Sequence, residues 1–439
     1  MVFVEQALLP LDLLGCSRWS REDLERFQSR RLARLVRHAS ERVPFYRDLY
    51  REHGIKPEDV RGLGDLPRLP VVGRDQMQLR PPGDLVASGY NPQRLIEWRT
   101  SGSTGAPFTI RRTWLEDRLL NLLRIRQQRL RGLTWSDVRT SSAIGELRRG
   151  PQAGGPIPGL RLLRRLPVNI LAEAREILTR LAEIQPDVIV MYPGTLAWIA
   201  AEATPEDRDK IRPRVIFTGG EVLTPAMRRQ IAECFRAPVF DFYGAHEFNL
   251  VSSECALTGL HHIEETGLIV EVLNNGRPCA EGESGEICGT ALHSFAMPFL
   301  RYRLGDVVVR GPARCPCGAP NSTLLRIEGR TVDRFPLPHG GSLHPYDLVV
   351  PLTCKVHWVR RYQIVQETLN RIRVRVVPMP SQKIDQDEKE MLKRLLESVV
   401  GTGVEVALDL VEEIRPNASG KLRSYYSELP NTAKNRSVV

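Results

Sequence analysis

One segment of the sequence, residues 100–107, has a composition that suggests phosphate chemistry. It interleaves four hydroxyl residues with two glycines and ends in Pro107. Backbone N–H groups beside glycines can approach phosphate oxygens closely, and the hydroxyl groups add further donors. The segment is not the P-loop of common ATPases, which ends in Gly-Lys-Ser/Thr. A flexible Ser/Gly linker is the alternative, but Pro107 and the strand-like residues 108–111 argue against it.

Four later segments carry side chains suited to a nucleotide and its chemistry. Residues 217–221 place a glycine pair after an apolar strand, so that a flat ligand can lie against the backbone. Residues 242–247 offer an aromatic ring for a base and a carboxylate for a metal ion. Residues 301–306 end in an acid that can accept hydrogen bonds from ribose, and residues 417–421 place a lysine after a tight turn. Each segment alone is also explained by turn residues or solvated charges.

A second constellation has the residue types of a metal site. Cys255 is followed by His261, and Cys315 and Cys317 come later in a Cys-Pro-Cys-Gly turn. Three sulfurs and one imidazole satisfy tetrahedral zinc, and a closed set of four protein ligands favours a structural role. Spacing does not show whether the two pieces meet in the fold, so chance thiols in loops are the alternative.

Helical and strand patterns alternate around these segments. Residues 20–41 predict a helix with Ser20 as N-cap and Asp23 as its partner, and the first 80 residues are mostly helical. From about residue 99 short apolar strands alternate with helices, which predicts a parallel or mixed sheet covered on both faces. The expected helices are 175–184, 193–203, 225–235 and 386–399, and the expected strands are 187–191, 214–217, 267–273, 285–289 and 371–377.

Composition narrows the class of protein. The formal charge is +10, but the arginines are spread along the chain and no aromatic-interleaved RNA motif occurs, so no nucleic-acid partner is expected. No apolar run approaches the roughly 20 residues that span a bilayer. Without a basic, apolar leader, the cytoplasm is the expected compartment. The eight cysteines therefore do not indicate a disulfide scaffold. With 439 residues we expect a large domain over 1–332, helical at 1–80, and a small one over 333–439.

Taken in order, the phosphate, glycine, aromatic, acidic and lysine segments resemble the adenylate-forming superfamily of acyl-CoA ligases, adenylation domains and luciferases. Residues 37–39 (Arg-His-Ala), 43–46 (Val-Pro-Phe-Tyr), 192–193 (Tyr-Pro) and 326–330 (Arg-Ile-Glu-Gly-Arg) look like the phenylacetate–CoA ligase branch. The resemblance covers most of the chain. It implies an α/β fold, in which a large N-terminal domain of mixed β-sheets with flanking helices is joined to a small mobile C-terminal α+β domain.

The resemblance implies an ATP-dependent enzyme that joins a carboxylic acid to AMP and releases pyrophosphate. The acyl group would then pass to coenzyme A, with an aryl or arylalkyl acid as the expected substrate. The alternative acceptor is an amine or a hydroxyl group, as in amide- and ester-forming ligases. A degenerate member that acts as a scaffold is a different class of alternative. The family also suggests a homodimer, and nothing suggests a membrane partner.

Site residues carry over by position in this sequence. Tyr243 would stack on adenine, Asp306 would bind the ribose hydroxyls, and Glu247 would ligate Mg²⁺. Lys421 would reach the carboxylate and α-phosphate oxygens from the small domain, which would then rotate about Asp333; an ordinary turn residue is the alternative for Asp333. The other nucleotide-binding candidates are Thr100, Ser101, Gly102, Ser103, Thr104 and Gly105 for the β- and γ-phosphates, Gly219, Gly220, Glu221 and Gly244 around the base, and Arg330.

The sequence departs from the family pattern at particular positions. Phe108 stands where many members carry lysine at the end of the phosphate loop. His246 stands where threonine usually lies beside the α-phosphate, and an imidazole there can donate to phosphate as a catalytic group. In the metal constellation, the family pattern Gly-Leu-His aligns with His261, so His262 is not the expected ligand.

Overall fold

The computed structural model describes residues 19–99, 108–131, 141–146, 164–170, 172–330, 334–343, 345–356, 358–379, 384–414 and 424–429. Its internal contacts divide the chain into two compact units. Unit 1 comprises Met1–Thr134 and Phe242–Ile327, and unit 2 comprises Trp135–Asp241 and Glu328–Val439. Neither unit is a continuous segment of chain. The domain boundary at residues 332 and 333 remains a prediction.

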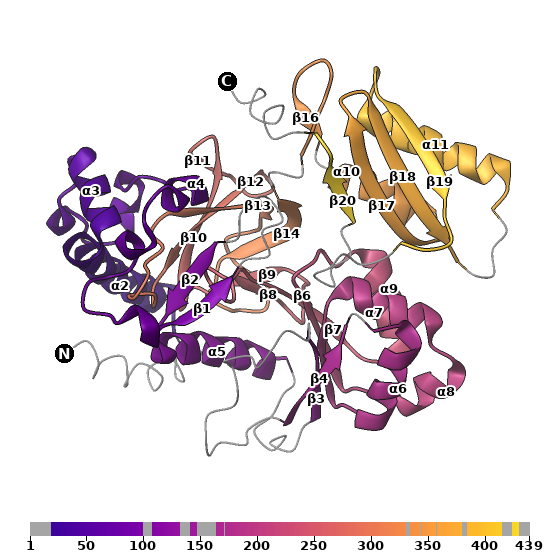
Figure 1. The fold of residues 1–439 in the computed structure, drawn as a ribbon, viewed down its shortest axis with the longest axis horizontal. Coiled ribbons are helices and arrows are strands. Elements are labelled where there is room, and N and C mark those ends of the chain that lie inside the picture. The colour runs from indigo at the N-terminus through magenta and orange to yellow at the C-terminus, as the bar shows by residue number, and fades with distance from the viewer. Residues whose placement is uncertain are drawn as a thin grey trace. The chain divides into compact units, whose positions relative to one another are not determined.

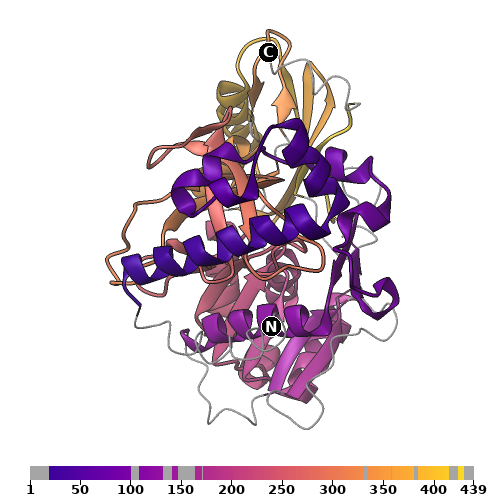
Figure 2. The same ribbon diagram turned by 90° about the vertical axis from the view of Figure 1, so that its left-hand side faces the viewer.

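The first helix of unit 1 begins at its expected capping signal. In α2 (Arg21–Arg42), the Ser20 hydroxyl accepts the Asp23 N–H and the Asp23 carboxylate accepts the Ser20 N–H. This reciprocal pair satisfies two N–H groups that the helix leaves open. Gln28 Nε2 then donates to the Leu268 carbonyl at 3.2 Å, and Figure 2 shows α2 running across the strands of the same unit. The other helices are α3 (Pro44–Glu52), α4 (Arg74–Gln78) and α5 (Trp114–Arg129), with 3₁₀ turns at Pro57–Asp59, Leu63–Arg68, Pro82–Leu85 and Pro92–Arg94.

The strands that lie in unit 1 or enter it have the order β11-β10-β12-β13-β14-β9-β8-β7, and β7 and β14 each cross the boundary between the two units. The pairs β10–β12, β12–β13, β14–β9, β9–β8 and β8–β7 are antiparallel. A separate ribbon pairs β1 (Ile96–Arg99) antiparallel with β2 (Thr109–Arg112). The sheet strands are β7 (Val239–Tyr243), β8 (Ser252–Glu254), β9 (His261–Ile263), β10 (Leu268–Asn274), β11 (Arg277–Pro278), β12 (Ser284–Ala291), β13 (Tyr302–Arg310) and β14 (Thr323–Arg330).

The first part of unit 2 alternates parallel strands with helices. The pairs β3–β4, β3–β5 and β5–β6 are parallel, and Figure 1 shows the helices gathered beside these strands. Ile189, Ile216 and Phe235 are at most 1% exposed in the core between them. The strands are β3 (Ser141–Glu146), β4 (Arg164–Asn169), β5 (Val188–Met191) and β6 (Val215–Gly219); the helices are α6 (Ala174–Ile184), α7 (Pro193–Glu202), α8 (Pro205–Lys210) and α9 (Pro225–Phe235).

The C-terminal part of unit 2 has its own α+β core. Its four-stranded sheet has the order β19-β18-β17-β20, and α11 lies against it (Figure 1). Leu392 and Leu396 of α11 are fully buried with Ile364 and Val374 of the sheet. The elements are β15 (Phe335–Pro336), β16 (Ser342–Leu343), α10 (Tyr346–Val350), a π-helical turn (Pro351–Lys355), β17 (Val359–Thr368), β18 (Arg371–Pro378), α11 (Gln386–Val400), β19 (Glu405–Leu410) and β20 (Tyr425–Ser427).

Every helix and strand predicted from the sequence over residues 175–399 is present within two residues of its expected bounds. The mixed α/β architecture with a small C-terminal α+β part is confirmed. Among the described residues, no helix has both the length and the apolar character needed to cross a bilayer.

Candidate active site

A tyrosine at the end of one strand and an aspartate in a neighbouring part of the same unit form the first pair of the site. Tyr243 ends β7, and its hydroxyl donates to Asp306 Oδ2 at 2.6 Å. Asp306 follows Gly305, whose φ of +81° favours glycine. The register of β12 and β13 shifts between Glu286 and Cys288, where β13 carries extra residues. This bulge sets the direction of Asp306, as bulges beside functional sites often do.

The turn after β7, residues 244–249, is closed by its own backbone. Asn249 N–H donates to the Ala245 carbonyl at 2.7 Å, and Phe248 N–H donates to the same carbonyl at 3.1 Å. A Cβ at Gly244 would lie 2.2 Å from the Asn249 carbonyl oxygen. Because that contact is with backbone, no side chain can move aside to make room. Gly244 is therefore required by the close approach of the turn to itself.

A buried arginine holds the middle of this turn. Arg112, at the end of β2, donates from Nη2 to the carbonyls of His246 and Glu247, the latter at 3.1 Å. Its side chain is 3% exposed, and burial lowers the pKa of the guanidinium, while Asp117, Glu116 and Glu247 oppose that shift. The guanidinium stays charged at neutral pH because its ordinary pKa is so high. Charge-assisted hydrogen bonds from Arg112 thus hold the carbonyl groups of His246 and Glu247 in place.

Helix α5 supplies a second set of contacts to the turn. Asp117 Oδ2 accepts Asn121 Nδ2 at 3.0 Å, and Asn121 Oδ1 accepts Asn249 Nδ2 at 3.4 Å. Asp117 Oδ1 accepts the indole N–H of Trp98 at 3.0 Å, and the Trp98 ring stacks on His246. The turn that carries His246 and Glu247 is therefore positioned from α5 and β1 together.

Glu247 is the buried carboxylate of the turn, with 6% of the residue exposed. The Tyr302 hydroxyl lies 3.4 Å from Glu247 Oε1. Burial raises the pKa of Tyr302 well above its ordinary value, and the charge of Glu247 adds to the rise. The Tyr302 phenol therefore stays protonated at neutral pH and can donate its O–H to Glu247. The carboxylate oxygens of Glu247 are ligands of the kind that Mg²⁺ prefers.

The predicted glycine pair lies in unit 2, at the end of β6. Gly220 has a φ of +79°, which glycine adopts without strain. The carboxylate of Glu221 accepts the backbone N–H of Gly194 at 3.0 Å, at the first turn of α7. A carboxylate at a helix N-terminus is stabilised by the helix dipole. Burial raises the pKa of Tyr192, and the nearby Glu221 adds to that rise.

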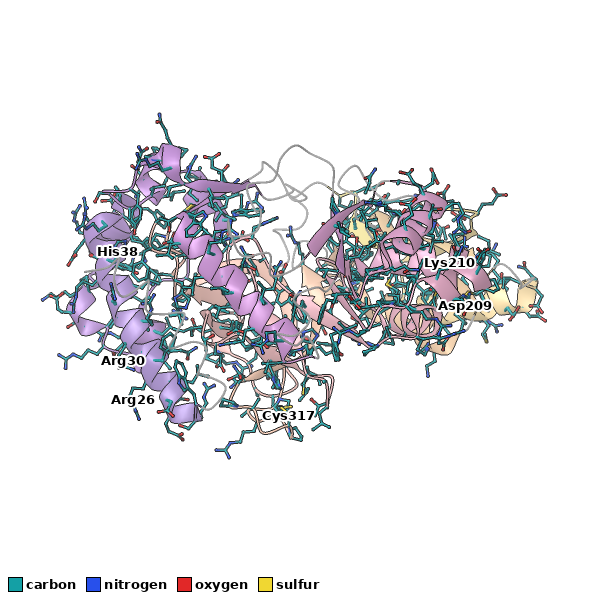
Figure 3. All side chains as sticks on the ribbon, turned by 90° about the horizontal axis from the view of Figure 1, so that it is seen from below. Arg26, Arg30, His38, Asp209, Lys210 and Cys317 are labelled. Atoms are coloured by element: carbon teal, nitrogen blue, oxygen red, sulfur yellow. The ribbon has the colours of Figure 1, made fainter. Side chains whose placement is uncertain are left out.

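The predicted metal constellation comes together in unit 1, with one correction. Cys255, His262, Cys315 and Cys317 place one ligand atom each within 4.8 Å of one another. The sulfurs of Cys255 and Cys315 are 3.8 Å apart, and the Cys317 sulfur is 3.5 Å from His262 Nε2. Zinc with Zn–S bonds of about 2.3 Å would give a tetrahedral sulfur–sulfur edge of about 3.8 Å. The residues present therefore fit a tetrahedral zinc ion. Figure 3 labels Cys317, one of the four residues.

The prediction that His261 is the histidine ligand is wrong, because the histidine beside the sulfurs is His262. Both histidines lie in β9, where successive side chains point to opposite faces. His261 is 7% exposed and its Nδ1 lies 3.3 Å from the Ser252 hydroxyl, so it belongs to the buried face. Spacing along the sequence could not distinguish these adjacent residues, because register decides which face each one occupies.

Comparison with known proteins gives a consistent set of similar proteins. Residues 338–428 match the model of the CapK C-terminal domain. The chain is 27% identical to a phenylacetate–coenzyme A ligase of Thermus thermophilus over 92% of this chain and 96% of that protein. A phenylacetate–coenzyme A ligase of Escherichia coli is also 27% identical, over 78% of this chain and 79% of its own length. A solved 2-hydroxyisobutyryl-CoA ligase with R3-HIB-AMP has a TM-score of 0.79 at 20% identity, covering 94% of this chain and 91% of that chain.

The chain is thus similar to phenylacetate–coenzyme A ligases over most of its length, and its fold is that of the 2-hydroxyisobutyryl-CoA ligase. Within the part of the chain that the structure describes, unit 1 brings together Tyr243, Gly244, His246 and Glu247 with Asp306. Unit 2 holds Gly219, Gly220, Glu221 and Arg330, the last at the end of β14. The phosphate-loop candidates Thr100, Ser101, Gly102, Ser103, Thr104 and Gly105, the hinge candidate Asp333 and the catalytic candidate Lys421 lie outside the described residues.

The residues that hold the turn of residues 244–249 in place were not predicted from the sequence. Trp98, Arg112, Asp117 and Asn121 all contact it or its supports. A signal for α5 was present: Thr113 and the following Glu116 form a capping box before an apolar run. Nothing in local spacing links these residues to the turn, because the contacts join distant parts of the chain.

Proposed function

We propose that this chain is an AMP-forming acid–CoA ligase. It activates a carboxylic acid with ATP, releases pyrophosphate and passes the acyl group to coenzyme A. One observation carries the proposal: a single clamped turn presents His246 and Glu247 next to a tyrosine that is hydrogen-bonded to Asp306. The similarity to phenylacetate–coenzyme A ligases over most of the chain supports an aryl or arylalkyl acid as substrate.

In the proposed first step, an oxygen of the substrate carboxylate attacks the α-phosphorus of ATP. The bond from that phosphorus to the bridging oxygen breaks, and pyrophosphate leaves as an acyl-adenylate forms. Tyr243 would contact the adenine, and Asp306 would accept ribose hydroxyl groups. Two anions approach each other in this step. Most of the catalysis therefore comes from positioning the reactants and from neutralising their negative charge. Lys421 would provide positive charge to the oxygens of the carboxylate and the α-phosphate.

Glu247 would hold Mg²⁺, which would supply positive charge to the phosphates of ATP. In the second step the sulfur of coenzyme A attacks the acyl carbonyl carbon, and AMP leaves as the thioester forms. The C-terminal domain would rotate about Asp333 between the two steps, so that Lys421 serves only the first. Excluding water protects the acyl-adenylate from hydrolysis.

The cluster of Cys255, His262, Cys315 and Cys317 would bind zinc in a structural role. All four positions of a tetrahedral ion would be filled by protein ligands, which leaves no position for substrate. Two separate loops would be joined through the ion. We therefore propose that zinc at this site would stabilise unit 1 and take no part in acyl transfer.

The proposed function is tested by product analysis. Purified protein is incubated with ATP, Mg²⁺ and a panel of aryl, arylalkyl and fatty acids, with coenzyme A or with an amine acceptor. The account expects AMP, pyrophosphate and an acyl-CoA thioester from at least one aryl or arylalkyl acid. An amide or ester product without any thioester would instead identify a ligase with another acceptor. Binding of ATP with no turnover of any acid would favour a scaffold.

A further inference from the structure

The rings of Trp98 and His246, two residues far apart in the sequence, are stacked with an offset in unit 1. Their ring centroids are 6.0 Å apart and their planes are inclined by 25°. Offset stacking at such a distance is attractive and favours near-parallel rings. The indole N–H of Trp98 also donates to Asp117 Oδ1 at 3.0 Å, and Asp117 is 1% exposed. The indole is therefore fixed at its edge while its face contacts the imidazole.

The main chain beneath His246 is fixed independently. Arg112 donates to the carbonyls of both His246 and Glu247. Tyr243, Glu247 and Phe248 are buried, whereas the side chain of His246 is exposed. In this turn the imidazole is the polar side chain most exposed to a ligand.

We propose that Trp98 is a positioning residue, which holds the imidazole of His246 toward the bound acid and nucleotide. This inference rests on the acid–CoA ligase function proposed above. The Trp98 ring stacks on the face of the imidazole, whereas the two ring nitrogens lie at its edge. Fixing the plane of the imidazole therefore fixes the directions in which Nδ1 and Nε2 point. Small errors in the placement of such a group slow a reaction strongly, because proximity and orientation supply much of the rate.

The kinetic test compares Trp98→Leu, Trp98→Phe and His246→Ala with the double variant Trp98→Leu/His246→Ala. Trp98→Leu should lower the rate of acid-dependent adenylation about tenfold and leave the KM for ATP within about twofold. Trp98→Phe retains an aromatic face and should recover most of the rate. In the His246→Ala background, Trp98→Leu should cause no further loss. An equal tenfold loss in both backgrounds would overturn the proposal, because Trp98 would then act independently of His246.

A structural readout accompanies the kinetics. The indole ring current shifts the ring-proton resonances of His246 in NMR spectra of histidine-labelled protein, and His246→Ala identifies those resonances. Trp98→Leu should move them, whereas Trp114→Leu should not. Trp114 is a matched control, since it lies on α5, is 50% exposed and contacts Arg118 instead. Unchanged His246 resonances in folded Trp98→Leu protein would also overturn the proposal.

The two accounts fail in different ways. If the wild-type protein adenylates no acid, the acid–CoA ligase function fails, while the NMR comparison still decides whether Trp98 orients His246. If the wild type adenylates an acid and the kinetic effects are additive, the ligase function stands and the positioning role fails. Thermal unfolding of each variant shows whether a loss of rate reflects loss of fold.

Discussion

At the scale of single residues, the turn from Gly244 to Asn249 depends on close backbone packing. Gly244→Ala would place a methyl group against the Asn249 carbonyl oxygen. We expect a loss of about 1–3 kcal/mol in the free energy of unfolding, as for other overpacked positions, and weaker ATP binding. Chemical denaturation and calorimetric titration with ATP measure the two effects.

Gly64→Ala is the matched control for that substitution, because a Cβ at Gly64 meets no atom within 4 Å. It should leave ATP affinity unchanged. If Gly244→Ala were as stable and as competent in ATP binding as Gly64→Ala, the turn would not be the rigid element described above.

Asp306 and Tyr243 should contribute unequally to nucleotide binding. Asp306→Ala removes a charged acceptor for ribose hydroxyls, and such hydrogen bonds contribute about 1.5–3 kcal/mol. We expect the Kd for ATP to rise about 10- to 100-fold. Tyr243→Phe keeps the ring and loses only the hydroxyl that donates to Asp306, so its effect should be within about tenfold. Equal effects in calorimetric titrations would contradict the assignment of Asp306 to ribose.

At the scale of elements, β9 decides which histidine faces the cysteines. We expect native mass spectrometry to find about one zinc ion in the wild-type chain, and His262→Ala should abolish it because it removes one of four ligands. His261→Asn is the matched control on the opposite face of the same strand and should retain about one zinc ion per chain. Retention of zinc by His262→Ala and loss by His261→Asn would restore His261 as the ligand.

Local signals in the sequence predicted most elements but not the face of each strand. The capping residues of α2 and the apolar runs of β5 and β6 are local patterns, and local patterns suffice to place elements. The part of the site that forms one short motif, residues 243–247, was predicted from the sequence. Register, the bulge that carries Asp306 and the Trp98–His246 stack depend on contacts between distant segments, which no short pattern records.

At the scale of the whole molecule, the two proposed half-reactions should respond differently to loss of Lys421. Lys421→Ala should lower adenylate formation by about 10²–10³, the usual loss for one charge-stabilising group. Thioester formation from pre-made acyl-AMP and coenzyme A should fall far less, because rotation of the C-terminal domain would move Lys421 away. Rapid-quench assays of each half-reaction provide the comparison.

Lys393→Ala is the matched control in the same C-terminal part of the chain. Lys393 is a surface residue of α11 that pairs with Glu397, so its loss should leave both half-reactions unchanged. Equal losses in the two half-reactions for Lys421→Ala would contradict domain rotation about Asp333.

The most direct test of the central proposal is exchange of labelled pyrophosphate into ATP, measured with Mg²⁺ and a panel of carboxylic acids in the absence of coenzyme A. Reversible formation of an acyl-adenylate predicts exchange that depends on the acid and is strongest with an aryl or arylalkyl acid. Glu247→Gln should reduce that exchange in the same assay. A folded protein that binds ATP and shows no exchange with any acid would contradict the account.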